Sequence, residues 1–123
     1  MRVAVPTWER RISPVFDTAG KFTVAEIERG KVVSQFIIPF QELFLPRRAI
    51  ILKRWRINTL ICGGISTYLV NLVAAQGIRV VPGIRGDVNE VLKAFCRGDI
   101  PSARFVMPGW RGRRRKRYAG GRY

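Results

Sequence analysis

The spacing of apolar residues predicts about five strands. "RVAVP" at residues 2–6 is a short buried strand that ends at its proline. Residues 21–27 and 31–38 are rich in β-branched and aromatic residues, and "ERGK" separates them, with Gly30 suited to the positive φ of a tight turn. These two runs therefore predict a hairpin. "INTLIC" at residues 57–62 and "IRVVP" at 78–82 predict two further buried strands.

Helical spacing follows in three later segments. Pro46 stands where a first helix would begin, and "RRAIILKRW" carries apolar residues at helical intervals after it. Ser66 is a plausible N-cap for a second helix that Gly77 would end. In "DVNEVLKAFCRG", Asp87 and Glu90 have capping-box spacing at the start of a third helix with one apolar face.

The order of these elements predicts a single α/β domain. A strand, a hairpin and then alternating helices and strands favour a mixed sheet, because strands joined by helical crossovers run parallel while the hairpin pairs antiparallel. The pattern predicts a three-layer domain over residues 1–108, with about five strands flanked by helices.

Charge sets the last residues apart from this domain. The chain of 123 residues has 23 Lys and Arg against 8 Asp and Glu, a net charge of +15. Residues 109–123, "GWRGRRRKRYAGGRY", hold seven of these cations and no acid, which predicts a disordered basic tail. Such a charge attracts anions, whether nucleic acid, anionic lipid or a small polyanion.

Several classes of protein do not fit this composition. The N-terminus has no apolar signal segment, no apolar run is long enough for a membrane helix, and two cysteines make no disulfide framework, so we expect a cytoplasmic protein with no membrane partner. The chain has no histidine, which removes the commonest general base and nitrogen ligand. Only Asp17 and Asp87 of the eight acids fall near the ends of the strands, and both have capping explanations. A two-metal nuclease is therefore disfavoured, and we expect no enzymatic activity.

A resemblance to a known family is carried by three collinear segments: "RVAVPTWERRISPVFDTAGKFTVAEIERGKVV", "INTLICGGIS" and "GIRVVPGIRGDVNEVLKAFCRGDI". These segments resemble the dinitrogenase iron-molybdenum cofactor biosynthesis family. The resemblance implies a ribonuclease H-like topology with strand order 3-2-1-4-5. It also implies binding of iron–sulfur or molybdenum–sulfur clusters, which many members of the family bind or carry during nitrogenase cofactor assembly.

The implied strand order places a binding crevice where the first and fourth strands end side by side. Glycines there would let backbone N–H groups approach an anionic cluster, and the helix that starts near Ser66 would direct its positive end at it. We also expect that helix end to lower the pKa of the one thiol available as a ligand. The predicted site has Cys62 as metal ligand and, as further cluster contacts, Thr7, Ser13, Gly63, Gly64, Arg85 and Gly86.

The chain departs from the family at Val15, where many members have a histidine. A cluster would therefore be held by one thiol, backbone amides and positive charge, which fits a carrier better than a permanent holder.

Each of these residues also has a simpler interpretation. Cys62 is also consistent with a small buried residue, and less readily with a reactive thiol, while Arg85 is equally consistent with a solvated charge. "SPVFD" at residues 13–17 is also typical of an ordinary turn. Packing is the favoured role for Cys96, and for Met107 a contact with the sheet or Trp110 rather than soft ligation.

The function predicted from the sequence is a small metal–sulfur cluster binding or carrier protein, whose partners are the cluster and a donor or acceptor protein. The alternative is a nucleic-acid-binding module, because residues 111–123 interleave arginines with aromatic residues. That segment is also consistent with a solubilising or partner-docking tail, or with one that draws the cluster toward the crevice.

Overall fold

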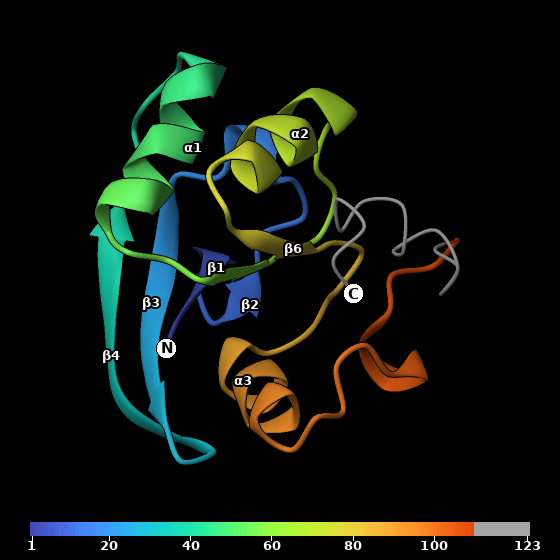
Figure 1. The fold of residues 1–123 in the computed structure, drawn as a ribbon. Coiled ribbons are helices and arrows are strands. Elements are labelled where there is room, and N and C mark those ends of the chain that lie inside the picture. The colour runs from blue at the N-terminus through green and yellow to red at the C-terminus, as the bar shows by residue number, and fades with distance from the viewer. Residues whose placement is uncertain (110–123) are drawn as a thin grey trace.

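The computed structural model describes residues 1–109, and these form one α/β domain around a mixed sheet. The main path of the sheet has the strand order β4-β3-β1-β5-β6. Helices α1 and α2 lie on one side of it and α3 on the other, which gives the predicted three layers (Figure 1). The bounds of the long strands are Arg2–Trp8 (β1), Lys21–Glu28 (β3) and Lys31–Pro39 (β4), and those of the short ones are Thr59–Ile61 (β5) and Arg79–Val81 (β6).

The sheet has six strands rather than the predicted five. The sixth, β2 (Arg11–Ile12), pairs antiparallel with the end of β1 and lies off the main path. Two residues are too few to give a periodic pattern, so the sequence could not indicate this strand. The implied likeness to ribonuclease H stays a prediction.

The pairing follows the predicted mixture of directions. β1 is antiparallel to β3 and parallel to β5, and β5 is parallel to β6. In the β3–β4 hairpin, Arg29 and Gly30 have φ of 54° and 74°, as a primed turn requires. Because β1, β5 and β6 are parallel, their carboxyl ends meet at one edge of the sheet.

Two of the three helices begin at the predicted caps. Ser66 Oγ accepts a hydrogen bond from the Leu69 N–H at 3.2 Å, and Asp87 Oδ2 accepts one from the Glu90 N–H at 3.0 Å. α1 has Pro46 in its first turn but no side-chain cap. The helices are Leu45–Arg54 (α1), Thr67–Ala75 (α2) and Val88–Cys96 (α3), and short 3₁₀ turns span Phe16–Thr18 and Ala103–Phe105.

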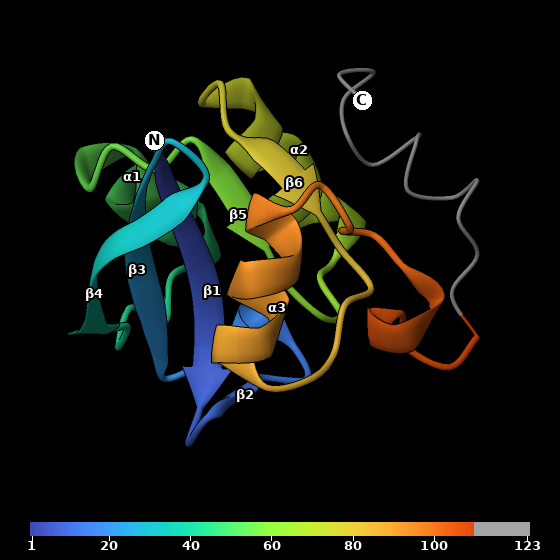
Figure 2. The same ribbon diagram turned by 90° about the horizontal axis from the view of Figure 1, so that it is seen from below.

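Alternation along the strands divides the core into two clusters. Ala4 and Leu60 face α1 and α2, whereas their neighbours Val5 and Ile61 face α3. Figure 2 shows α3 crossing the face of the sheet opposite α1 and α2. The two faces are thus separate environments, and a residue at a strand end belongs to one or the other.

Within residues 1–109, no helix is long and apolar enough to cross a membrane. The predicted tail at 109–123 falls outside the described residues except for Gly109, and so does the contact between Met107 and Trp110. Met107 itself donates its N–H to the Gly83 carbonyl at 2.7 Å, beside the end of β6.

Candidate functional site

The glycine turn after β5 lies against the loop that follows β2. The Gly64 N–H donates to the Pro14 carbonyl at 2.7 Å, and the Phe16 N–H donates to the Gly64 carbonyl at 2.8 Å. A Cβ on Gly63 would lie 2.8 Å from the Pro14 oxygen. Glycine is required at position 63 because backbone carbonyl oxygens of the preceding loop occupy the space that a side chain would fill. The sequence had predicted that a ligand would occupy this space.

Cys62 directly follows β5 and lies inside the core between the sheet and helices α1 and α2. Its side chain is 0% exposed and packs among the residues of that cluster. Burial raises the pKa of its thiol far above the ordinary value, and the nearby negative charge of Asp17 raises it further. The expected lowering of this pKa by the start of α2 is therefore wrong. Whether Cys62 ligates a metal stays a prediction.

The start of α2 already has a carboxylate partner. Asp17 Oδ1 accepts a hydrogen bond from the Ser66 N–H at 3.0 Å. This carboxylate offsets the positive end of the helix. The sequence predicted that this helix end would attract an anionic ligand. Asp17 already supplies part of the negative charge that such a ligand would bring.

The buried side chain of Arg48, which the sequence did not indicate as part of the site, holds the same loop in place. Arg48 of α1 is 2% exposed, and its Nη1 donates to the carbonyl oxygens of Phe16 at 3.0 Å and Ala19 at 2.9 Å. Its Nε donates to the Glu42 carbonyl at 2.9 Å, and its guanidinium lies 4.2 Å from the centroid of the Phe40 ring. Burial lowers the pKa of Arg48, while Asp17 and Glu42 oppose that shift. No local signal in "LPRRAIILKR" distinguishes this arginine from its exposed neighbours.

The hydroxyl residues of the predicted site are also buried. Thr7 Oγ1 donates to the Val5 carbonyl at 2.7 Å and lies 2.8 Å from Thr23 Oγ1. The Ser13 N–H donates to the Pro6 carbonyl at 2.8 Å. Thr7 thus links β1 to β3, and Ser13 links the loop after β2 to β1.

Arg85 and Gly86 lie on the α3 side of the sheet, directly after Gly83 and Ile84, whose N–H groups donate to the Gly63 and Cys62 carbonyls at 2.9 Å. They line a cavity of about 340 Å³ together with Arg11, Asp87, Glu90, Arg104 and Phe105. Three arginines and two acids share this cavity, and Arg104 donates to Glu90 Oε1 at 2.6 Å. A Cβ on Gly86 would lie 3.1 Å from the Phe105 ring, so packing also explains this glycine.

A comparison of the sequence with known families gives one match. Residues 1–98 match the family described as dinitrogenase iron-molybdenum cofactor. The chain belongs to this family. The match spans the whole sheet and all three helices, and it associates the chain with processes related to the iron–molybdenum cofactor.

Solved structures with this family's fold superpose well on the chain. The crystal structure of PH0822 has a TM-score of 0.76 at 25% sequence identity, and the alignment covers 80% of this chain and 90% of that one. For mj0327 from Methanocaldococcus jannaschii, the TM-score is 0.69 at 22% identity, with the same coverage. The apo form of the orange protein from Desulfovibrio gigas gives 0.67 at 19% identity, covering 85% of this chain and 94% of that one. At these low identities the last two likenesses establish the fold alone. No curated protein matches the chain.

In this member of the family, the predicted site residues divide into two groups. Ser13 and residues 62–64 lie together around the loop that Asp17 and Arg48 hold, and Val15 lies beside Gly64 in the same place. Thr7 stands outside this group, because its hydroxyl contacts Val5 and Thr23 in the sheet. Arg85 and Gly86 form the second group. Among the described residues, no three side chains of Cys, Asp or Glu are grouped so that they could hold a metal ion.

Proposed function

We propose that this protein binds an anionic metal–sulfur cluster, of the iron–sulfur or molybdenum–sulfur type, and carries it to a recipient protein without catalysing a reaction. The observation that carries the proposal is membership of the dinitrogenase iron-molybdenum cofactor family over residues 1–98. The net charge of +15 supports it, because a cationic protein concentrates anions around itself. We place this activity in the cytoplasm.

The donor set of the described residues supports transient binding. A permanent cluster site uses several thiolates, commonly four. This chain has two cysteines, which lie in different parts of the fold, and no histidine. Lysine and arginine side chains must therefore supply most of the attraction, and a cluster held by charge is released more readily than one held by several thiolates.

Anaerobic reconstitution tests this function directly. The purified full chain is incubated with iron, sulfide and tetrathiomolybdate, desalted, and examined by metal analysis and visible absorption. We expect molybdenum and a sulfide-to-metal absorption band to stay with the protein, and the retained amount to fall as salt rises because charge dominates the binding. Molybdate has the same charge and shape without sulfur and provides the control ligand. Metal retention no greater than that of an unrelated protein of similar charge would contradict the proposal.

Nucleic-acid binding is the second candidate, and its support lies in the basic segment 111–123. That segment is outside the described residues, so this candidate rests on composition alone. It is tested below by removing the segment.

A further inference from the structure

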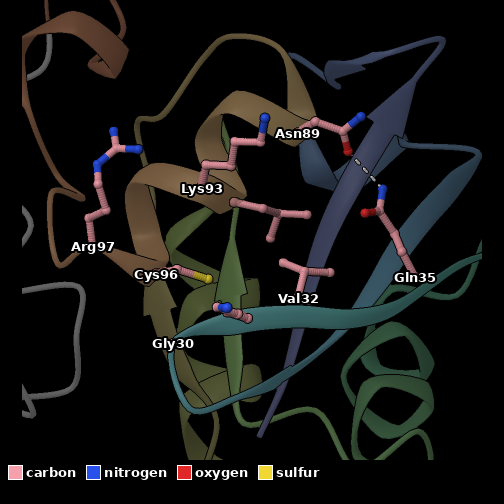
Figure 3. Close-up of a pocket in the computed structure, with 9 residues that line it drawn as sticks. Gly30, Val32, Gln35, Asn89, Lys93, Cys96 and Arg97 are labelled. Carbon is pink, nitrogen blue, oxygen red and sulfur yellow. Dashed lines mark hydrogen bonds between the residues drawn. The ribbon is translucent and has the colours of Figure 1, made fainter.

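A groove runs between the edge strand β4 and helix α3, on the face of the sheet away from Cys62 (Figure 3). It has a volume of about 530 Å³ and extends to the β3–β4 turn, at the end of β1 opposite the glycine turn. The Gln35 side chain of β4 donates to Asn89 of α3 at 2.9 Å and bridges the two elements. The residues that line the groove are Gly30, Lys31, Val32, Gln35, Asn89, Leu92, Lys93, Cys96 and Arg97.

The charged residues that line this groove are all positive. Three of its lining residues are cations and none is an acid. Arg97 pairs with Asp99 at 3.2 Å, and Figure 3 shows its guanidinium directed away from β4. Within residues 1–109, neither Lys31 nor Lys93 has a carboxylate within ion-pair distance. Both lysines can therefore contact an anionic ligand, with Glu28 opposite Lys31 in the β3–β4 ladder as the neighbouring acid. The cavity around Arg85 differs, because two acids accompany its arginines.

The groove also contains the accessible thiol of the chain. Figure 3 shows the Cys96 sulfur directed from α3 toward Gly30 in the β3–β4 turn. Cys96 is half-buried, whereas Cys62 is fully enclosed. A side chain on Gly30 would enter this space, since its Cβ would already lie 4.0 Å from the Cys96 carbonyl oxygen. Val32 and Leu92 add apolar walls, so the groove combines positive charge with sulfur and hydrocarbon surfaces.

This combination suits a soft anion better than a strongly hydrated one. Sulfide ligands spread charge over large polarisable atoms and tolerate contact with thiol and hydrocarbon, whereas oxyanions require dense hydrogen bonding. We propose that this groove binds a small thiometallate anion, held by Lys31 and Lys93 with the Cys96 thiol in contact with it. The class of anion rests on the proposed function, while the location rests on the groove. The contact is non-covalent, so no bond forms or breaks.

The attraction of the groove for anions is tested without any metal. Iodoacetate and iodoacetamide alkylate the same thiol, but only iodoacetate is negatively charged. In the native full chain we expect Cys96 to be alkylated and Cys62 to stay unmodified, with the positions assigned by peptide mass spectrometry. The rate ratio of iodoacetate to iodoacetamide at Cys96 should fall roughly threefold or more in a Lys31→Gln, Lys93→Gln variant, because both lysines line the same groove as the thiol and attract the anionic reagent.

A matched control separates this local effect from net charge. The Lys53→Gln, Arg54→Gln variant loses the same two charges at the end of α1, on the other side of the sheet, and its ratio should stay near that of the wild type. Equal ratios in the wild type and the groove variant would overturn the groove as an anion site.

Uptake of tetrathiomolybdate then tests the ligand. We expect the groove variant and Cys96→Ser each to retain several-fold less molybdenum after desalting than the wild type, and the α1 control to retain as much. If the wild type binds and the groove variant binds equally well, the location is wrong. If only Cys96→Ser binds equally well, the thiol contact is wrong. If the wild type itself retains none, both the proposed function and the thiometallate assignment fail, and the alkylation ratio alone decides whether the groove attracts anions.

Discussion

Close packing at Gly63 leaves no room for a side chain, and the cost of adding one can be measured. The carbonyl oxygens of Pro14 and Ser13 would lie 2.8 and 3.1 Å from an added Cβ, and both belong to backbone that cannot rotate away. Gly63→Ala should therefore lower the free energy of unfolding by about 1–3 kcal/mol, as overpacking does elsewhere. Chemical denaturation monitored by circular dichroism measures this change.

Gly20 provides the control for this substitution. Nothing lies within 4 Å of a Cβ built on it, and its φ is not in the left-handed region. Gly20→Ala should leave stability unchanged or raise it by up to about 1 kcal/mol, because alanine restricts the unfolded chain. If Gly63→Ala were as harmless as Gly20→Ala, the loop would not be pressed against the turn as described.

For Cys62, the sequence predicted the position of the residue but not the pKa of its thiol. The sequence indicated that Cys62 ends a strand next to two glycines, and in the structure it directly follows β5, which ends at Ile61. It could not show that Asp17, 45 positions earlier, would lie close enough to raise the pKa of this thiol. The expected pKa was wrong because burial and charge at Cys62 come from residues that only the folded chain brings together.

At the scale of elements, Arg48 joins α1 to the loop before β3. A buried guanidinium that donates to three carbonyl groups fixes those groups, and its removal takes a hydrogen-bond donor from each of them. Arg48→Met retains much of the side-chain volume, and we expect it to lower the free energy of unfolding by about 2–4 kcal/mol. Amide hydrogen exchange at Phe16 and Ser66 should become faster, since the loop they belong to would be held less firmly.

Arg47, the preceding residue of α1, is exposed and gives a matched substitution. Arg47→Met should change stability by no more than about 0.5 kcal/mol. Similar losses for the two variants would mean that Arg48 contributes through the charge of the helix rather than through its carbonyl partners.

The sequence predicted elements correctly where interactions between neighbouring residues determine them. The hairpin with Gly30 in its turn and the caps at Ser66 and Asp87 are all confirmed, because turn conformation and helix capping depend on neighbouring residues. β2 was missed because two residues carry no period. The groove between β4 and α3 was missed for another reason. Its residues lie 54 positions apart at Gln35 and Asn89, and only the packing of the helix on the hairpin brings them together.

At the scale of the whole molecule, positive charge is divided between the folded domain and the C-terminal segment. Residues 111–123 contain seven of the 23 cations, which leaves +8 on the remainder of the chain. The groove lysines, Cys96 and the family match all lie within residues 1–98. Cluster binding and nucleic-acid binding therefore depend on different parts of the sequence, and a truncation can separate them.

Deletion of residues 111–123 is the experiment that distinguishes the two functions. As a cluster carrier, the shortened protein should still fold and retain thiometallate, with slower uptake because long-range attraction is weaker. As a nucleic-acid-binding module, the full chain should bind DNA or RNA with a slope of log K against log salt of about −0.9 for each duplex phosphate neutralised. The shortened chain should then lose most of that affinity. Titration of both forms against labelled DNA and RNA at several salt concentrations, in parallel with cluster reconstitution, measures both activities. Tight nucleic-acid binding that requires residues 111–123, together with no metal retention by either form, would replace the cluster-carrier function with the alternative.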